Sequence, residues 1–193
     1  RISCADLLAG GLALLAATLF LDGNVAVAAV LAVAAALTKE TTLILTVAVA
    51  GASWRGHRSR AVMFAAPAVA VTGAVWVALV VMFPHVGRQY GELGFPLRGL
   101  ADSARYWRDT HDWKPALAVV TTLGLAGCAV RRRSPLALAT AAYLALVCLQ
   151  AMGTLAFWTS APRTLYPLGL CAVASLLDGR RVPALSAPLP APV

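Results

Sequence analysis

Residues 25–52 decide the fold of this chain, and they read VAVAAVLAVAAALTKETTLILTVAVAGA. Two apolar stretches are interrupted there only by residues 38–42, which places Lys39 and Glu40 at or near membrane depth. Ionisable residues cost roughly 2.5–3.5 kcal/mol each to insert at the centre of a bilayer, so they usually face a cavity, a partner or a substrate. The plainer interpretation is that Lys39 and Glu40 neutralise each other at a helix end.

The composition excludes an ordinary soluble domain. Of the 193 residues, 60% are hydrophobic and 12% are charged, with a mean hydropathy of +0.78, whereas soluble domains carry about 25% charged residues. The net charge of +8 does not indicate a nucleic-acid partner, because the basic residues lie in short clusters between apolar runs. The sequence therefore predicts a polytopic integral membrane protein surrounded by membrane lipids.

The number of membrane spans depends on how residues 25–53 are divided. As one helix they would extend about 43 Å at 1.5 Å per residue, too long for one span and too short for two spans of about 20 residues. We expect two short helices with a turn recessed into the membrane, where irregular backbone must line a cavity. An all-α bundle of about seven transmembrane helices results, or six if 25–53 is one helix. The predicted spans are 2–21, 25–37, 41–53, 61–83, 115–130, 135–156 and 164–177.

Arginine clusters in the short loops predict the orientation of these spans. The clusters lie at residues 55–60, 131–133 and 180–181, which all fall on one side of the membrane if the spans are as given. Because basic residues are enriched in cytoplasmic loops, this side is cytoplasmic. Residues 1–181 thus form a transmembrane helical domain, and the Pro-rich tail 182–193 is a disordered cytoplasmic end.

The outer loop at residues 84–114 contains a segment with helical periodicity. Apolar side chains recur on one face, and charges of opposite sign lie three and four residues apart on the other. This pattern predicts a short amphipathic helix on the membrane surface, which either packs over the outer ends of the spans or covers a substrate. The apolar positions are Leu97, Leu100, Ala101, Ala104 and Trp107, and the charged positions are Arg98, Asp102, Arg105 and Asp109.

Four charged residues collect at the outward ends of the predicted spans: Asp6, Lys39, Glu40 and Arg163. Arg163 has no acidic neighbour within ten residues, and a cation at a helix start opposes the helix dipole, which favours anions there. An anion held between Arg163 and Lys39 explains this placement, because Arg binds phosphate through its bidentate fork and Lys as a point charge. The alternative is that Arg163 extends to lipid headgroups. The histidines and cysteines show no metal-ligand spacing, so no metal site is predicted.

Residues 35–41, AALTKET, resemble the Leu-Thr-Lys-Gly/Glu segment of the GT-C superfamily of integral-membrane glycosyltransferases. The order of features is also similar to that of its polyprenyl-phosphate-sugar-dependent, mannosyltransferase-like members. An outward Asp6 opens a span, a Lys-bearing turn joins two short helices, a basic inner loop and an outer loop with a surface helix follow, and Arg163 and Pro167 form a late Arg-x-x-x-Pro. The likeness covers most of residues 1–177.

The resemblance implies that a sugar is transferred from a polyprenyl-phosphate carrier to an acceptor on the outer face of a bacterial plasma membrane. It implies that Lys39 and Arg163 bind the carrier phosphate, that Glu40 holds Lys39 in place, and that Asp6 has a positioning role. The acidic residue of this superfamily, a base or metal ligand, belongs to an outer loop that would lie upstream of Arg1. We therefore expect a central and C-terminal fragment with no catalytic residue and no cofactor of its own. Its partners would be the lipid-linked sugar donor and the missing N-terminal part, which would hold any divalent metal.

Two other interpretations stay open. A transporter or flippase-like bundle would use Lys39 and Glu40 to line a permeation path, since short broken helices also occur in that class. A truncated, inactive fragment is the other. The enzyme requires a carboxylate-bearing outer loop upstream, whereas a transporter should show a matching broken helix pair in a second repeat.

Overall fold

The computed structural model describes residues 4–83, 95–132, 134–150, 152–157 and 160–178. Every element in these residues is helical, which confirms the all-α prediction. The tail 182–193 and residues 180–181 of the predicted layout lie outside the described residues. The elements are α1 (Cys4–Leu21), α2 (Val25–Thr38), the 3₁₀ turn η1 (Glu40–Thr42), α3 (Leu43–Ser53), α4 (Arg58–Met82), α5 (Arg98–Thr110), α6 (Trp113–Val130), α7 (Pro135–Cys148), α8 (Met152–Leu155) and α9 (Ala161–Leu177).

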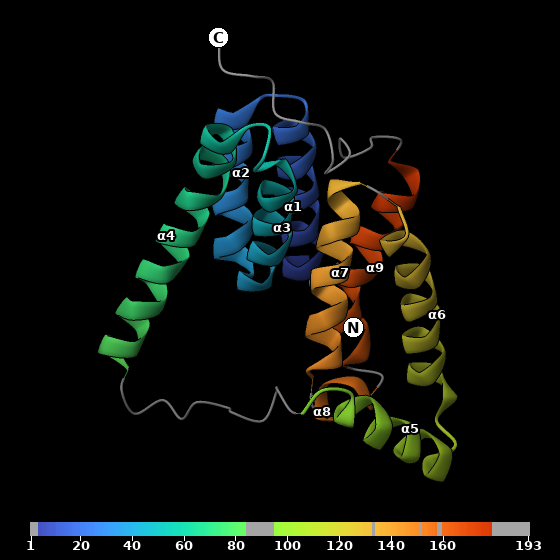
Figure 1. Cartoon of the computed structure of the whole chain (residues 1–193). Coiled ribbons are helices and arrows are strands. Elements are labelled where there is room, and N and C mark those ends of the chain that lie inside the picture. The colour runs from blue at the N-terminus through green and yellow to red at the C-terminus, as the bar shows by residue number, and fades with distance from the viewer. Residues whose placement is uncertain (1–3, 84–94, 133, 151, 158–159, 179–193) are drawn as a thin grey trace.

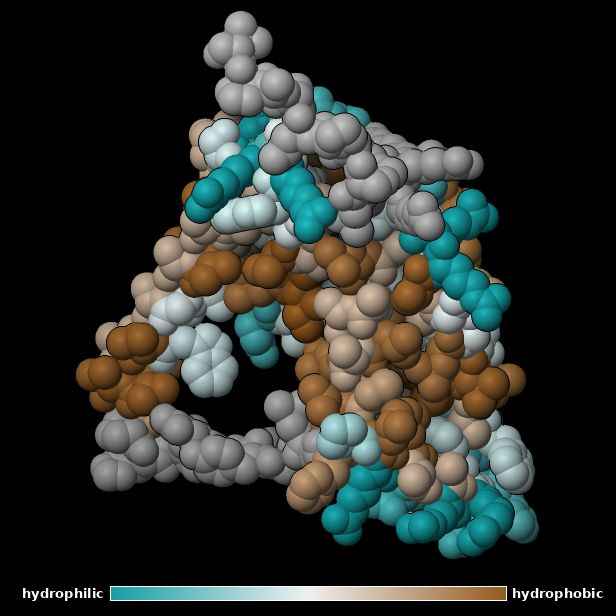
Figure 2. Space-filling model, viewed as in Figure 1, coloured by the Kyte–Doolittle hydropathy of each residue, from teal (hydrophilic) through white to brown (hydrophobic). Residues whose placement is uncertain are grey.

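Within the described residues, three helices are long and apolar enough to cross a membrane: α1, α4 and α6. The helices α2 and α7 and the segments Glu40–Ser53 and Leu165–Leu177 are apolar but shorter. Each predicted span contains an apolar helix, but the span predicted over 135–156 is not a single helix, because α7 ends at Cys148 and Met152–Leu155 form the separate short helix α8. The number of helices that cross the membrane stays a prediction. The space-filling view has apolar side chains along the middle of the bundle and hydrophilic ones gathered towards its two ends, as a bilayer requires (Figure 2).

The helices form two groups that meet along the middle of the molecule (Figure 1). In the first group, α1 packs on α2, and α4 packs on α2 and α3. In the second group, α9 packs on α6 and α7, while α5 lies across one end with α8. Contacts of α3 with α7 and of α1 with α9 join the two groups. The candidate site lies at this junction.

Small side chains allow the helices to approach closely. The buried positions of α1 and α2 are mostly alanine, and small residues at helix interfaces bring the backbones near enough for van der Waals attraction. Larger side chains fill the space towards α4, where the rings of Phe20 and Phe64 stack with centroids 4.4 Å apart. The buried alanines of α1 and α2 are Ala9, Ala13, Ala16, Ala17, Ala28, Ala32, Ala35 and Ala36.

The run at residues 25–53 is broken at Lys39, so it is not one helix. Lys39 caps α2 in an extended conformation, with φ −158° and ψ 114°, and the chain reverses direction there (Figure 1). The neighbouring threonines satisfy the backbone groups that the break exposes. Thr38 Oγ1 donates to the Ala34 carbonyl at 2.8 Å, and both the backbone N–H and the hydroxyl of Thr42 donate to the Lys39 carbonyl. This is how a broken helix remains stable at membrane depth.

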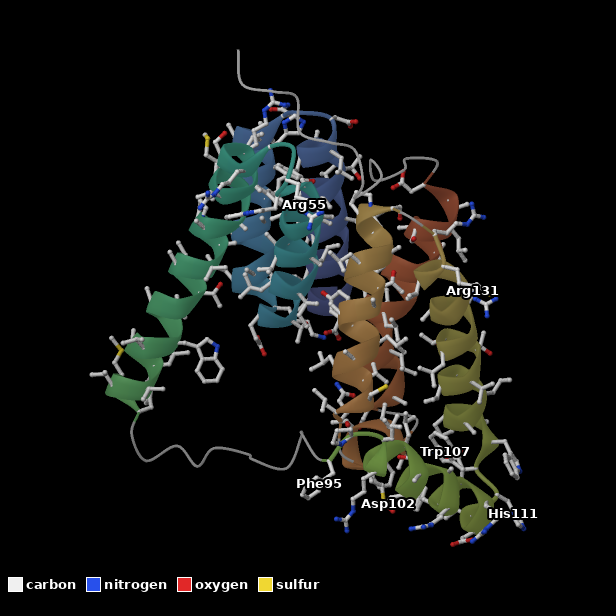
Figure 3. The ribbon with its side chains drawn as sticks, in the orientation of Figure 1. Arg55, Phe95, Asp102, Trp107, His111 and Arg131 are labelled. Carbon is white, nitrogen blue, oxygen red and sulfur yellow. The ribbon has the colours of Figure 1, made fainter. Side chains whose placement is uncertain are left out.

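The α2–α3 turn ends well short of the level of α5 and α8, so it is recessed into the bundle (Figure 1). Figure 2 shows a hollow in the molecule on that side of the turn, between α4 and α7. Arg55 and Arg131 lie at the opposite end from Asp102, Trp107 and His111 of the α5 region (Figure 3). The arginine clusters predict that their loops lie at the same end of the bundle. The structure agrees for the two loops that contain Arg55 and Arg131.

The helix predicted in the outer loop is present as α5, but its buried face differs from the expected one. Trp107 is buried and its indole N–H donates to the Ala156 carbonyl at 2.9 Å. Gly99 and Ser103 are buried beside it, whereas the predicted apolar positions Leu97, Ala101 and Ala104 are exposed. The indole hydrogen bond and the small residues at 99 and 103 fix which face packs, and a sequence pattern weighted only by hydrophobicity does not detect them.

Candidate functional site

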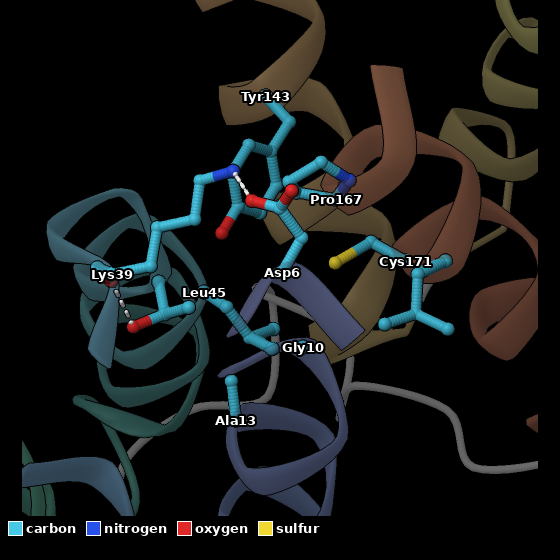
Figure 4. A pocket seen from close by; sticks show the side chains of 10 residues that line it. Asp6, Gly10, Ala13, Lys39, Leu45, Tyr143, Pro167 and Cys171 are labelled. Carbon is cyan, nitrogen blue, oxygen red and sulfur yellow. Dashed lines mark hydrogen bonds and ion pairs between the residues drawn. The ribbon is translucent and has the colours of Figure 1, made fainter. Parts of the chain in front are cut away.

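The site is built around an ion pair between Lys39 and Asp6 (Figure 4). The Lys39 ammonium donates to Asp6 Oδ1, although the two residues lie 33 positions apart. Asp6 stands in the first turn of α1, where the helix dipole favours a carboxylate. Lys39 is at the break after α2. The Asp6 side chain is 4% exposed and that of Lys39 is 24% exposed, so the pair lies inside the bundle with the lysine on its more accessible side.

A small cavity lies next to the ion pair, at the junction of α1, α3, α7 and α9. Its volume is about 10 Å³, roughly the room for one water molecule. Apart from the two charged side chains and Tyr143, its walls are mostly apolar. The wall residues are Asp6, Gly10, Ala13, Lys39, Thr42, Leu45, Tyr143, Pro167, Leu170 and Cys171.

Tyr143 fixes the turn that carries Lys39. Its ring is buried, and its hydroxyl donates to the Thr41 carbonyl at 2.8 Å. This bond connects α7 to η1 and therefore holds the Lys39 backbone relative to the second helix group. The hydroxyl of Thr41 is buried without a hydrogen-bond partner in the described part of the chain, so the backbone carbonyl carries this link.

Glu40 does not hold Lys39 in the structure. Its side chain is exposed at the start of η1, and the carboxylate that pairs with Lys39 is that of Asp6. The supporting role expected of Glu40 thus falls to Asp6 in the structure. The first turn of α1 provides a buried carboxylate that the ammonium reaches, whereas the Glu40 side chain is exposed.

The fourth predicted residue, Arg163, lies in the first turn of α9, and its side chain lies outside the described part of the structure. Its helix begins three residues earlier than predicted, at Ala161. Pro167, one turn further along α9, lines the cavity beside Lys39. At 1.5 Å per residue the Arg163 backbone is about 6 Å along the helix axis from Pro167. Because proline has no N–H, it also leaves the Arg163 carbonyl without its usual helical donor.

A second, larger recess lies on the outer side of the same wall. This groove between α6 and α9 has a volume of about 370 Å³ and apolar walls except for Thr122 and Tyr166. Leu170 lines both the groove and the cavity of the ion pair. A Cβ added to Gly10 would lie 2.7 Å from Tyr166 Cε1, so the tyrosine packs directly against α1, one turn from Asp6. Two side chains, Tyr166 and Leu170, thus separate the groove from the ion pair.

Tyr143, Tyr166 and the partnership of Asp6 with Lys39 were missed in the sequence analysis. One signal for Tyr143 was available, because a phenol inside an apolar helix usually finds a hydrogen-bond partner. Within the described residues, no group of three or more His, Cys, Asp or Glu side chains could hold a metal ion. The arrangement itself offers electrostatic chemistry, because it presents a partly accessible lysine ammonium, bonded to the Asp6 carboxylate, in mostly apolar surroundings.

Comparison of the chain with protein-family models, with curated proteins and with solved structures finds no match in any of the three. The geometry of the ion pair is therefore the basis of the functional argument.

Proposed function

We propose that this chain is part of a membrane glycosyltransferase that transfers a sugar from a polyprenyl-phosphate carrier to an acceptor on the outer face of the membrane. The observation that carries the proposal is the position of Lys39. It stands at a broken helix end inside an apolar bundle, partly accessible, beside a cavity walled by Pro167 of α9. Within this proposal, the carrier phosphate binds between Lys39 and Arg163, which begins the same helix α9.

The chemical role of these cations follows from charge development. Cleavage of the sugar–phosphate bond leaves negative charge on the departing phosphate, and cations that are already in place stabilise this charge in the transition state. A site that is partly screened from water strengthens the effect, because the effective dielectric is low. The recessed α2–α3 turn supports such screening (Figure 1). The cytoplasmic side is assigned to the end with Arg55 and Arg131, which puts the α5 end on the outer face.

The direct test is sugar transfer by the longer parent protein. Lys39→Ala or Arg163→Ala should reduce transfer from a labelled polyprenyl-phosphate donor by about 10²-fold or more, because loss of one charge-stabilising group costs about 2.7–4 kcal/mol in the transition state. Lys114→Ala is the matched control, since Lys114 is an exposed lysine at the start of α6. The isolated chain should show no transfer. Full activity of the Lys39 and Arg163 variants would refute the phosphate-binding roles, and turnover by the isolated chain would refute an upstream catalytic carboxylate.

A transporter is the second candidate, favoured by the buried Asp6–Lys39 pair itself. Ion pairs inside an apolar bundle often mark a substrate or ion path. Purified parent protein in liposomes separates the two functions. A transporter moves a labelled lipid-linked sugar between leaflets without an acceptor, whereas the enzyme releases the sugar only when an acceptor is present.

A further inference from the structure

The exposed arginines at the two ends of the bundle differ in whether they have a carboxylate partner. The arginines of α5 all pair with aspartates, as Arg98–Asp102, Arg105–Asp102 and Arg108–Asp109. At the opposite end, Arg58 and Arg60 of α4 are exposed, and neither forms an ion pair within the described residues. The positive charge is thus balanced within the chain on α5, whereas that of Arg58 and Arg60 is not.

We propose that the α3–α4 turn, residues 54–60, binds the headgroup of an anionic phospholipid in the leaflet beside it. The turn reads WRGHRSR, with three arginines and no acidic residue. The helices α1 and α9 also end on this side, where Asp22 and Asp178 follow them (Figure 1). Beyond the described residues the sequence has one further acidic side chain, Glu92, which follows α4 at its other end. The inference does not depend on the proposed function.

Trp54 and Arg58 give this turn a positioned binding group. The Arg58 guanidinium carbon lies 5.1 Å from the centroid of the Trp54 ring, which is within the range of a cation–π interaction. Trp54 follows α3 directly and is 43% exposed, and tryptophan is enriched at the level of lipid headgroups. Within the described residues the side-chain N–H groups of Arg58 donate to no acceptor. They are therefore available to bind two oxygens of one phosphate, as the planar guanidinium does.

The surroundings of the turn leave room for a headgroup. Arg60 adds a second exposed cation two residues after Arg58, and a Cβ at Gly56 would meet nothing within 4 Å. Figure 2 shows hydrophilic side chains gathered at this end, beyond the apolar middle of the bundle, and Figure 3 has Arg55 there. Because basic side chains at this level attract anionic lipids, the expected ligand is a phospholipid with net negative charge.

The test measures binding of phosphatidylglycerol to this 193-residue chain in detergent micelles. Phosphatidylcholine with the same acyl chains is the control lipid, because its headgroup has no net charge, and native mass spectrometry counts the lipids bound during a titration. Phosphatidylglycerol should bind with a dissociation constant at least about fivefold lower than phosphatidylcholine, and Arg58→Gln should weaken its binding about fivefold. Arg105→Gln should have little effect, since Arg105 is also exposed but pairs with Asp102 at 3.1 Å. Equal affinities for the two lipids would overturn the proposal.

Two further variants distinguish a built site from attraction by net charge alone. Arg58→Lys keeps the charge and loses the planar guanidinium, and Trp54→Leu keeps the charge and loses the ring beside it. Each should weaken phosphatidylglycerol binding about threefold. Unchanged binding in both variants would mean that only diffuse attraction acts, which would overturn the site.

A crosslinking measurement needs no variant. Phosphatidylglycerol with a photoreactive headgroup, in nanodiscs that contain the unmodified chain, should attach to residues 54–60. Attachment only to other segments would overturn the proposal. Excess inorganic phosphate, compared with chloride at the same ionic strength, should not prevent the attachment. If it does, the turn binds free phosphate and not a lipid, and the proposal fails.

Discussion

The hydroxyl of Tyr143 on α7 donates a hydrogen bond of 2.8 Å to the backbone carbonyl of Thr41, 102 residues earlier in the chain. This bond holds the turn that carries Lys39 against the second helix group. The turn that interrupts the apolar run is therefore held by a side chain of a distant helix. The position of the Lys39 ammonium depends on this contact.

Replacing Tyr143 by phenylalanine, which has no hydroxyl, tests how much this hydrogen bond contributes to stability. Tyr143→Phe should lower the free energy of unfolding in detergent micelles by about 0.5–1.5 kcal/mol, the net contribution of one hydrogen bond. Tyr106→Phe is the control, because Tyr106 is half-buried and its hydroxyl makes no hydrogen bond in the described part of the chain. Denaturant titration of both variants checks the difference. Equal stabilities would show that the bond to Thr41 contributes nothing.

Because α1 and α9 are in close contact, two adjacent glycines, Gly10 and Gly11, should respond differently to substitution by alanine. A Cβ at position 10 would lie 2.7 Å from Tyr166 Cε1 and 3.0 Å from Leu170 Cδ2, whereas a Cβ at Gly11 would meet nothing within 4 Å. Gly10→Ala should therefore destabilise the chain by about 1–3 kcal/mol through overpacking. Gly11→Ala should be neutral or stabilising by up to about 1 kcal/mol, because alanine favours a helix over glycine.

Thermal unfolding of the two glycine variants measures this contrast. Adding Tyr166→Leu to Gly10→Ala removes the ring that the new methyl group meets, so much of the lost stability should return. Identical behaviour of Gly10→Ala and Gly11→Ala would mean that α1 and α9 are not in contact at this point.

The hydrogen bond of Trp107 should stabilise α5 locally. Its indole N–H bonds to the Ala156 carbonyl from a buried position, whereas Trp113, in the first turn of α6, is 60% exposed. Trp107→Phe should lose about 1 kcal/mol of local stability and raise hydrogen–deuterium exchange of the α5 amides about fivefold. Trp113→Phe should leave that exchange unchanged. Faster exchange in both variants, or in neither, would argue against the Trp107 hydrogen bond as the anchor of α5.

The orientation in the membrane is tested by labelling single cysteines in sealed vesicles. After replacement of the four native cysteines, Arg55→Cys and Asp109→Cys place one exposed thiol at each end of the bundle. An impermeant maleimide added from outside to right-side-out vesicles should label position 109 and reach position 55 only after the membrane is permeabilised. Labelling of both positions from the same side would contradict the topology.

Several features of the fold follow from local sequence. Apolar runs separated by arginine-rich loops predict the helices, because in lipid each backbone polar group must be satisfied within its own helix. The same reasoning predicts the break at Lys39, since a single helix over 25–53 does not match the bilayer thickness. The threonines at 38, 41 and 42 mark where the break occurs, and two of them supply its hydrogen bonds.

The partners of the polar side chains were decided only by the tertiary structure. The sequence places Glu40 beside Lys39, yet the ammonium bonds to Asp6 of another helix. It gives no register between α7 and η1, on which the Tyr143 bond depends, and none between α1 and α9. The length of each apolar run is set by the thickness of the membrane, and it can be read from the local sequence. Which side chains meet between helices depends on how small residues let the helices approach and rotate against each other, and that is a property of the packed bundle as a whole.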